Sequence, residues 1–125
     1  MSSLKETLVE LSELHGPTGH EEEVADFLEQ RFKALGWEVR RDTLGNVIAK
    51  KGKGGKKILV AAHMDEIALA VTAITEKGFL KFTKVGGIFD GAVGNTRVIV
   101  HADKRIPGLI GLKAPHLMKD EEAKK

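Results

Sequence analysis

The run "ILVAAHMDEIALAV" is the feature that most constrains how this chain folds. Its first half, "ILVAAH", is apolar without alternation, which is typical of a strand buried on both faces. The run ends on His63 and, two residues later, Asp65. Buried polar groups must find partners, and buried charges are costlier still. Either these two side chains only satisfy each other, or the strand delivers them to a functional site.

Two helices are predicted before this run. Ser3 and Glu6 have the spacing of a capping box, and leucines recur behind them on one helical face. Thr18 and Glu21 repeat that spacing at the start of a second apolar stripe. Gly36 directly follows this stripe and is expected to end the second helix.

The remaining pattern is extended. "WEVRR" alternates, and "LGNVIAKK" follows it through a Gly45-Asn46 turn, which predicts a hairpin. Beyond Asp65, the segments "ALAVTAI", "FLKFTKV", "RVIVHA" and "GLIGL" are predicted as short strands separated by glycines. We therefore expect an α/β domain over residues 1–68 and a β-rich domain over residues 69–125.

Composition excludes several classes of protein. The 125 residues carry 20 basic and 18 acidic side chains, a net charge of +2, which gives no electrostatic reason to expect a nucleic-acid or membrane partner. Cysteine is absent, so disulfides and thiolate metal sites are excluded. The charged N-terminal segment is not a signal peptide, and no apolar run has the length of a membrane span. We expect a cytoplasmic protein.

His63 and Asp65 suit a catalytic metal site. Such sites use neutral imidazole and carboxylate ligands and keep one coordination position open for water. If the strand persists through residue 65, the two side chains share a face, and the carboxylate can accept the proton of the ring nitrogen that does not bind metal. His-x-Asp is a short motif, however, and spacing alone favours a structural pair. The further ligands and the general base must come from elsewhere.

His15 and His20 flank a Gly-Pro turn and are interpreted as capping or surface residues. His101, on the predicted strand "RVIVHA", and His116 lie far in sequence from His63. Glu121 and Glu122 are interpreted as surface residues. The two glutamates sit in "KDEEAKK", a charge run that is usually a solvated helix face. A second group is basic: Lys50, Lys51, Lys53, Lys56 and Lys57. Their segment does not fit a phosphate-binding P-loop and is predicted to be an exposed loop. "VGGIFDGAVG" lacks dinucleotide-binding spacing and is predicted to be a turn.

Several motifs together resemble one family. "GPTGHEEEV", "TLGNVIAKK", "LVAAHMDEIAL", "GFLKFTKVGG" and "PGLIGLKAPHL" occur in the order found in the tetrahedral-type (TET) dinuclear metallo-aminopeptidases. The resemblance covers nearly all of the chain, and "AAHMDEIAL" is its most specific part. The resemblance implies that His63 binds a catalytic metal and that Asp65 orients the His63 ring. Ala68 stands where relatives commonly have glycine, which leaves the ligands untouched.

The resemblance also implies a fold and partners. The fold would be the N-terminal part of a zinc-exopeptidase-like catalytic domain, followed by the start of an inserted, PDZ-like dimerisation domain. Two divalent metal ions, zinc or cobalt, would act on short peptides, and dimers would assemble into a tetrahedral shell. Some members carry endoglucanase names, but no suitable carboxylate pair or sugar platform supports that activity here.

The same resemblance predicts that this sequence is an N-terminal portion. The family's bridging aspartate, its glutamate pair and its last histidine ligand follow the inserted domain, and the sequence ends within that domain. We therefore expect the chain alone to be inactive and to pair with itself or with a complementary C-terminal portion. The alternative is an association fragment without a peptidase role.

Overall fold

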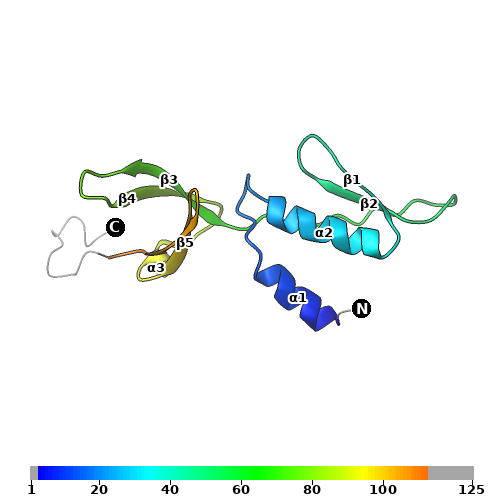
Figure 1. Cartoon of the computed structure of the whole chain (residues 1–125), viewed down its shortest axis with the longest axis horizontal. Coiled ribbons are helices and arrows are strands. Elements are labelled where there is room, and N and C mark those ends of the chain that lie inside the picture. The colour runs from blue at the N-terminus through cyan, green and yellow to red at the C-terminus, as the bar shows by residue number, and fades with distance from the viewer. Residues whose placement is uncertain (1–2, 113–125) are drawn as a thin grey trace. The chain divides into compact units, whose positions relative to one another are not determined.

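The computed structural model describes residues 3–112, which form two compact units separated in sequence between Gly86 and Gly87. The first contains α1 (Leu4–Ser12), α2 (Glu22–Ala34), β1 (Glu38–Arg41), β2 (Val47–Lys50), β3 (Ala68–Ile74) and β4 (Leu80–Val85) (Figure 1). The second contains α3 (Asp90–Val93), β5 (Arg97–His101) and β6 (Arg105–Leu109). The strands of the described chain pair as three antiparallel hairpins, β1–β2, β3–β4 and β5–β6. The mixed helix and strand content agrees with the α/β expectation.

The first predicted cap is confirmed. The Ser3 hydroxyl accepts the Glu6 backbone N–H at 3.2 Å, and the Glu6 carboxylate accepts the Ser3 backbone N–H at 2.7 Å. These two bonds satisfy backbone donors that the first turn of α1 leaves without a helical partner. The capping box therefore fixes the start of α1 at the residue that the sequence indicates.

The second predicted cap is wrong. Helix α2 begins at Glu22, and Glu21 occupies the N-cap position without a side-chain cap. Glu21 instead accepts the Gly19 backbone N–H at 2.6 Å, and the Thr18 hydroxyl donates to Asp65. The local spacing was suitable, but a partner 47 residues away takes the hydroxyl.

Helix α2 ends at Ala34, and Gly36 follows as the predicted C′ residue, with a φ of +74° in the left-handed region. Its backbone N–H donates to the carbonyl of Lys33 at 2.9 Å, and the N–H of Trp37 donates to the carbonyl of Phe32 at 3.1 Å. This pair of bonds is the Schellman motif. The rings of Phe32 and Trp37 also pack, with centroids 5.3 Å apart, so the chain turns directly into β1.

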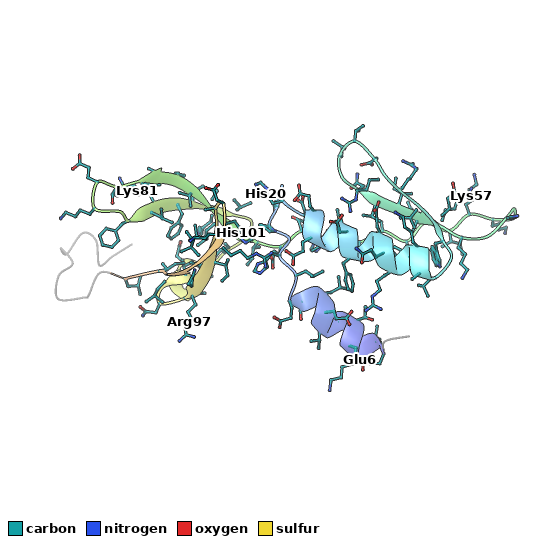
Figure 2. The ribbon with its side chains drawn as sticks, in the orientation of Figure 1. Glu6, His20, Lys57, Lys81, Arg97 and His101 are labelled. Atoms are coloured by element: carbon teal, nitrogen blue, oxygen red, sulfur yellow. The ribbon has the colours of Figure 1, made fainter. Side chains whose placement is uncertain are left out.

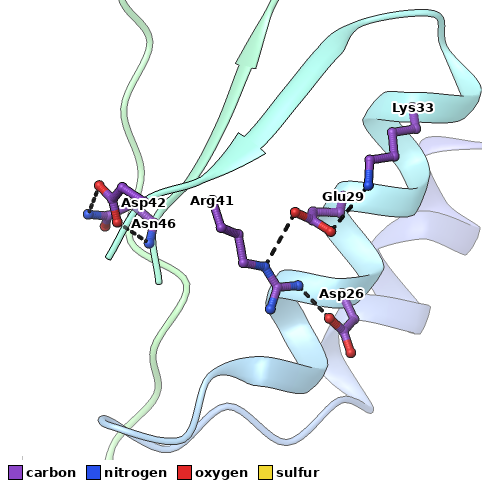
Figure 3. Close-up of polar contacts among 6 residues, drawn as sticks. All are labelled: Asp26, Glu29, Lys33, Arg41, Asp42 and Asn46. Carbon is purple, nitrogen blue, oxygen red and sulfur yellow. Dashed lines mark hydrogen bonds and ion pairs between the residues drawn. The ribbon is translucent and has the colours of Figure 1, made fainter. Parts of the chain in front are cut away.

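The β1–β2 hairpin packs against α2. Arg41 of β1 forms ion pairs with Asp26 and Glu29 of the helix, and Lys33 pairs with Glu29 one turn further on (Figure 3). Val24, also on α2, is among the few buried apolar residues of the described chain, at 8% exposure. Ion pairs therefore hold the hairpin side of α2, whereas Val24 lies on the opposite side of the helix, next to Gly16.

The turn of this hairpin is organised by one carboxylate. Asp42 accepts the backbone N–H of Leu44 at 3.0 Å. It also accepts the backbone N–H of Asn46 at 3.0 Å and the Asn46 side-chain amide at 2.9 Å (Figure 3). Gly45 takes a φ of +88°, which favours glycine. The predicted Gly45-Asn46 turn is thus confirmed.

The strand predicted for "ILVAAH" is not formed, and this expectation is wrong. Residues 58–63 lie outside every strand, and Ile58, Leu59 and Val60 are each 89% exposed. A buried strand needs neighbours to accept its backbone hydrogen bonds. Within residues 3–112, the strands pair only with one another, as β1–β2, β3–β4 and β5–β6, so no described strand pairs with this segment.

The β-rich part matches most of its predicted strands. "ALAVTAI" forms β3 and most of "FLKFTKV" forms β4, with a register shift between Val71 and Ala73. "RVIVHA" forms β5, but its partner β6 begins at Arg105, earlier than "GLIGL" predicted. The segment "VGGIFDGAVG", expected to be a turn, contains the short helix α3. The proposed domain boundary at residue 68 coincides with the start of β3 and remains a prediction.

Candidate functional site

The ring of His63 contacts Asp65, two residues further along the chain. The ring Nδ1 lies 3.0 Å from the backbone oxygen of Asp65 and 3.2 Å from its carboxylate Oδ1. Both are hydrogen-bond acceptors, so the neutral ring is expected to carry its proton on Nδ1. The lone pair is then on Nε2. Because the side chain is 86% exposed, it is accessible to a ligand.

The carboxylate of Asp65 is held from its other side. Its Oδ2 accepts the Thr18 hydroxyl at 2.9 Å, while Oδ1 faces the His63 ring. The Thr18 hydrogen bond is the largest of the interactions that hold the pKa of Asp65 below its usual range, and the hydrogen bond from His63 acts in the same direction. The carboxylate is therefore ionised at neutral pH and can act as the acceptor for His63.

A short parallel bridge brings Thr18 to this place. The Glu66 backbone N–H donates to the Gly16 carbonyl at 2.8 Å, and the Thr18 N–H donates to the Glu66 carbonyl at 3.3 Å. Pro17 lies opposite Glu66 in this bridge, where its missing N–H is not needed. The Glu66 carboxylate also accepts the Gly16 N–H at 3.0 Å. The loop before α2 is thus fastened to the segment that carries Asp65.

Gly16 is required by close packing at this bridge. A Cβ at this position would lie 2.7 Å from Val24 Cγ2 and 3.2 Å from the carbonyl oxygen of Met64. The first separation is shorter than real Cβ contacts, so a side chain here would move α2 or the chain beside His63. The absence of a side chain at residue 16 therefore helps to set the position of the site.

The other histidines do not build a larger cluster with His63. Residues 3–112 contain no group of three or more histidine, aspartate or glutamate side chains arranged to hold a metal ion. His20 lies in the turn before α2, where its backbone N–H donates to the Pro17 carbonyl at 2.8 Å (Figure 2). His101 lies on β5 in the second unit. His116, Glu121 and Glu122 lie outside the described residues.

The lysine-rich segment forms the exposed loop that the sequence predicts. Residues 51–57 are all exposed, and Lys57 lies on this loop (Figure 2). The Lys51 ammonium is 5.7 Å from the centroid of the Trp37 ring, a cation–π contact that engages one of the charges. The helices within residues 3–112 are all too short or too polar to span a membrane.

The sequence singled out His63 and Asp65, whose role at a metal remains a prediction, but it did not indicate the residues that hold them. Thr18 was assigned to a helix cap, and neither Glu66 nor Gly16 was assigned to the site. Glu66 could have been noted because it directly follows Asp65. No local signal marks Thr18, since its partner is 47 residues away.

The chain matches a known family. Residues 45–125 match the family described as M42 glutamyl aminopeptidase. FrvX of Escherichia coli (strain K12), an aminopeptidase by name, is 40% identical over 119 residues; the match covers 94% of this chain and 33% of FrvX. The chain therefore belongs to the M42 family, and the resemblance found in the sequence is confirmed. It spans about a third of the length of such relatives.

Solved structures give the same result. The TET aminopeptidase of a marine sediment Thaumarchaeota archaeon matches with a TM-score of 0.88 and 33% identity, over 97% of this chain and 35% of that one. The TET1 peptidase of Pyrococcus horikoshii, which can assemble into a tetrahedron or a large octahedral shell, matches with a TM-score of 0.81 and 36% identity. That match covers 94% of this chain and 36% of the other.

Proposed function

We propose that this chain supplies part of the active site of a metal-dependent aminopeptidase. The observation that carries the proposal is the held imidazole of His63, with Nδ1 facing Asp65 and Nε2 left to bind a metal. Membership of the M42 family supports the same reaction class. Asp65 is proposed as a partner that fixes the ring and raises its basicity, not as a direct ligand.

The donor chemistry fits a divalent metal. Neutral imidazole suits zinc and cobalt, and two such ions are proposed for the complete enzyme. When bound, these metals would lower the pKa of a water molecule that attacks the N-terminal peptide bond of a short peptide. His63 would bind one metal through Nε2, while Asp65 would keep the proton on Nδ1. The bridging carboxylate, the remaining ligands and the general base would come from outside the described residues.

We further propose that the chain functions in a homo-oligomer in the cytoplasm. The P. horikoshii relative, which can form a tetrahedron, supports this proposal. Residues 69–125 would begin a PDZ-like domain that pairs two subunits, and dimers would build the shell. A complementary C-terminal portion is a second proposed partner, because relatives are about three times as long as this chain.

Two substitutions test the assignment in a complete enzyme that carries this chain. His63→Ala is expected to abolish hydrolysis of aminoacyl anilides and lower the bound metal content, with an unchanged circular dichroism spectrum because the side chain is exposed. Asp65→Asn is expected to weaken metal affinity roughly ten- to a hundredfold, the usual cost of losing such a partner. Normal turnover and metal content in His63→Ala would contradict the proposal, as would a metal-bound structure with Asp65 at coordination distance.

A second candidate function is association without catalysis by this chain alone. It is favoured by the lack of a three-ligand group within residues 3–112. Because catalytic metal sites usually take three protein ligands, the purified chain is expected to bind Zn²⁺ or Co²⁺ weakly and to hydrolyse no aminoacyl anilide. Robust turnover by a monodisperse 125-residue species would show that the ligands have been misplaced.

A further inference from the structure

We propose that Thr18 is a positioning residue for the metal ligand His63 and acts through the carboxylate of Asp65. The inference rests on the proposed function, in which His63 binds metal. The geometry is a relay of three side chains: the Thr18 hydroxyl bonds one carboxylate oxygen of Asp65 at 2.9 Å, and the other oxygen lies 3.2 Å from His63 Nδ1. Each carboxylate oxygen therefore has a different partner.

The hydroxyl proton has one preferred acceptor. Thr18 Oγ1 lies 2.9 Å from Asp65 Oδ2 and 3.4 Å from the Glu66 backbone oxygen, and a hydroxyl donates one proton. The carboxylate is both closer and charged, and charge-assisted hydrogen bonds are the stronger ones. Thr18 therefore donates to Asp65.

Packing does not hold this part of the site. The side chains of His63 and Asp65 are 86% and 40% exposed. Exposed side chains keep a single rotamer only where hydrogen bonds hold them, since few neighbours restrict their rotation. Without the Thr18 hydroxyl, the Asp65 carboxylate could turn away from Nδ1, and the ring would lose the acceptor that fixes its proton and direction.

Thr18 is itself fixed by its backbone. Its N–H donates to the Glu66 carbonyl at 3.3 Å, next to the Glu66–Gly16 bond at 2.8 Å. The ring of Pro17 restricts φ between these two bonds. The hydroxyl does not cap α2, because Glu21 occupies the N-cap position. The side chain is thus presented to Asp65 from a rigid frame.

Two variants of Thr18 separate this role from general packing. Thr18→Val keeps the shape but removes the hydroxyl, and Thr18→Ser keeps the hydroxyl. The first measurement is ¹⁵N NMR of the histidine rings in the metal-free chain, at a pH where His63 is neutral, with the His63→Ala spectrum identifying its signals. Wild type and Thr18→Ser are expected to keep the Nδ1–H tautomer, and Thr18→Val is expected to shift toward the Nε2–H tautomer.

The second measurement is Zn²⁺ binding by the same chains. Thr18→Val is expected to weaken binding about three- to tenfold, less than the roughly ten- to hundredfold expected from losing Asp65 itself. In an Asp65→Ala background, Thr18→Val should have no further effect, because two residues that act through one contact are not additive. Thr18→Ser should bind as the wild type does.

The outcomes distinguish this inference from the proposed function. If His63→Ala weakens Zn²⁺ binding but Thr18→Val changes neither tautomer nor affinity, the role of Thr18 is refuted and the ligand assignment stands. Additive losses from Thr18→Val and Asp65→Ala would likewise refute a role through Asp65. If His63→Ala leaves Zn²⁺ binding unchanged, the proposed function fails, and the tautomer spectra still decide whether Thr18 orders the ring.

Discussion

The exposed apolar segment at residues 58–60 predicts that the purified chain self-associates. Ile58, Leu59 and Val60 are each 89% exposed and lie in a segment that pairs with no described strand. Unpaired backbone with apolar side chains is a template for pairing with another chain. The perturbation we choose is Leu59→Asp, which places a charge at the centre of this stretch.

The size of the effect follows from burial. Covering one such side chain contributes about 1.5–3 kcal/mol, so covering all three contributes about 4.5–9 kcal/mol. Leu59→Asp removes one of these three contributions from each contact. Losing Leu59 would then weaken association roughly ten- to a hundredfold.

Leu44→Asp is the matched control. Leu44 is 86% exposed, so the substitution and the exposure are alike, but it lies in the polar turn between β1 and β2. Sedimentation velocity over a concentration series should show association of the wild type and of Leu44→Asp, and a largely monomeric Leu59→Asp. The reasoning is refuted if the wild type is monomeric throughout, or if both aspartate variants weaken association equally.

Two further predictions concern packing and pH. Gly16→Ala should lower the free energy of unfolding by about 1–2 kcal/mol, because overpacking costs about 1–3 kcal/mol and the stiffer unfolded chain returns about 0.4–1 kcal/mol. Urea denaturation followed by Trp37 fluorescence measures this, and a cost undiminished in a Val24→Ala background would contradict the clash. The Asn46 amide is the largest influence that lowers the pKa of Asp42, so Asn46→Ala should raise that pKa toward 3.8 in carboxyl ¹³C NMR titrations. Because folding lowers the pKa of Asp42, the ionised carboxylate stabilises the folded chain at every pH above the pKa of the unfolded chain. This stabilisation is lost as the pH falls through the pKa of the folded chain. An Asp42 titration midpoint that Asn46→Ala leaves unchanged would refute this account.

The features that sequence predicted correctly are local ones. The box of Ser3 and Glu6, the helix end at Gly36 and the turn at Asn46 each depend on groups within a few residues of one another. Their geometry depends on local backbone conformation and on short side chains, and both can be predicted from the residue types nearby. The contact between His63 and Asp65 is local in the same sense, because it spans two residues, while their role at a metal remains a prediction.

The features that sequence missed depend on distant partners. Thr18 has suitable cap chemistry, but Asp65 lies where its hydroxyl points and provides a charged acceptor. The apolar pattern of residues 58–62 indicates a buried strand, but such a strand forms only where neighbouring strands can pair with it. β6 starts earlier than predicted because its register is set by pairing with β5, where Arg105 lies opposite His101.

The bridge between residues 16–18 and residue 66 predicts that the site forms late in folding. Its ends are separated by about fifty residues, and bringing them together costs loop-closure entropy that local turns do not incur. The helices and the β1–β2 hairpin can form before this closure, but the arrangement around Asp65 cannot. The amide hydrogen of Glu66, which donates to Gly16, is shielded only after closure. Its exchange with solvent deuterium would therefore time the assembly of the site, separately from the formation of the helices.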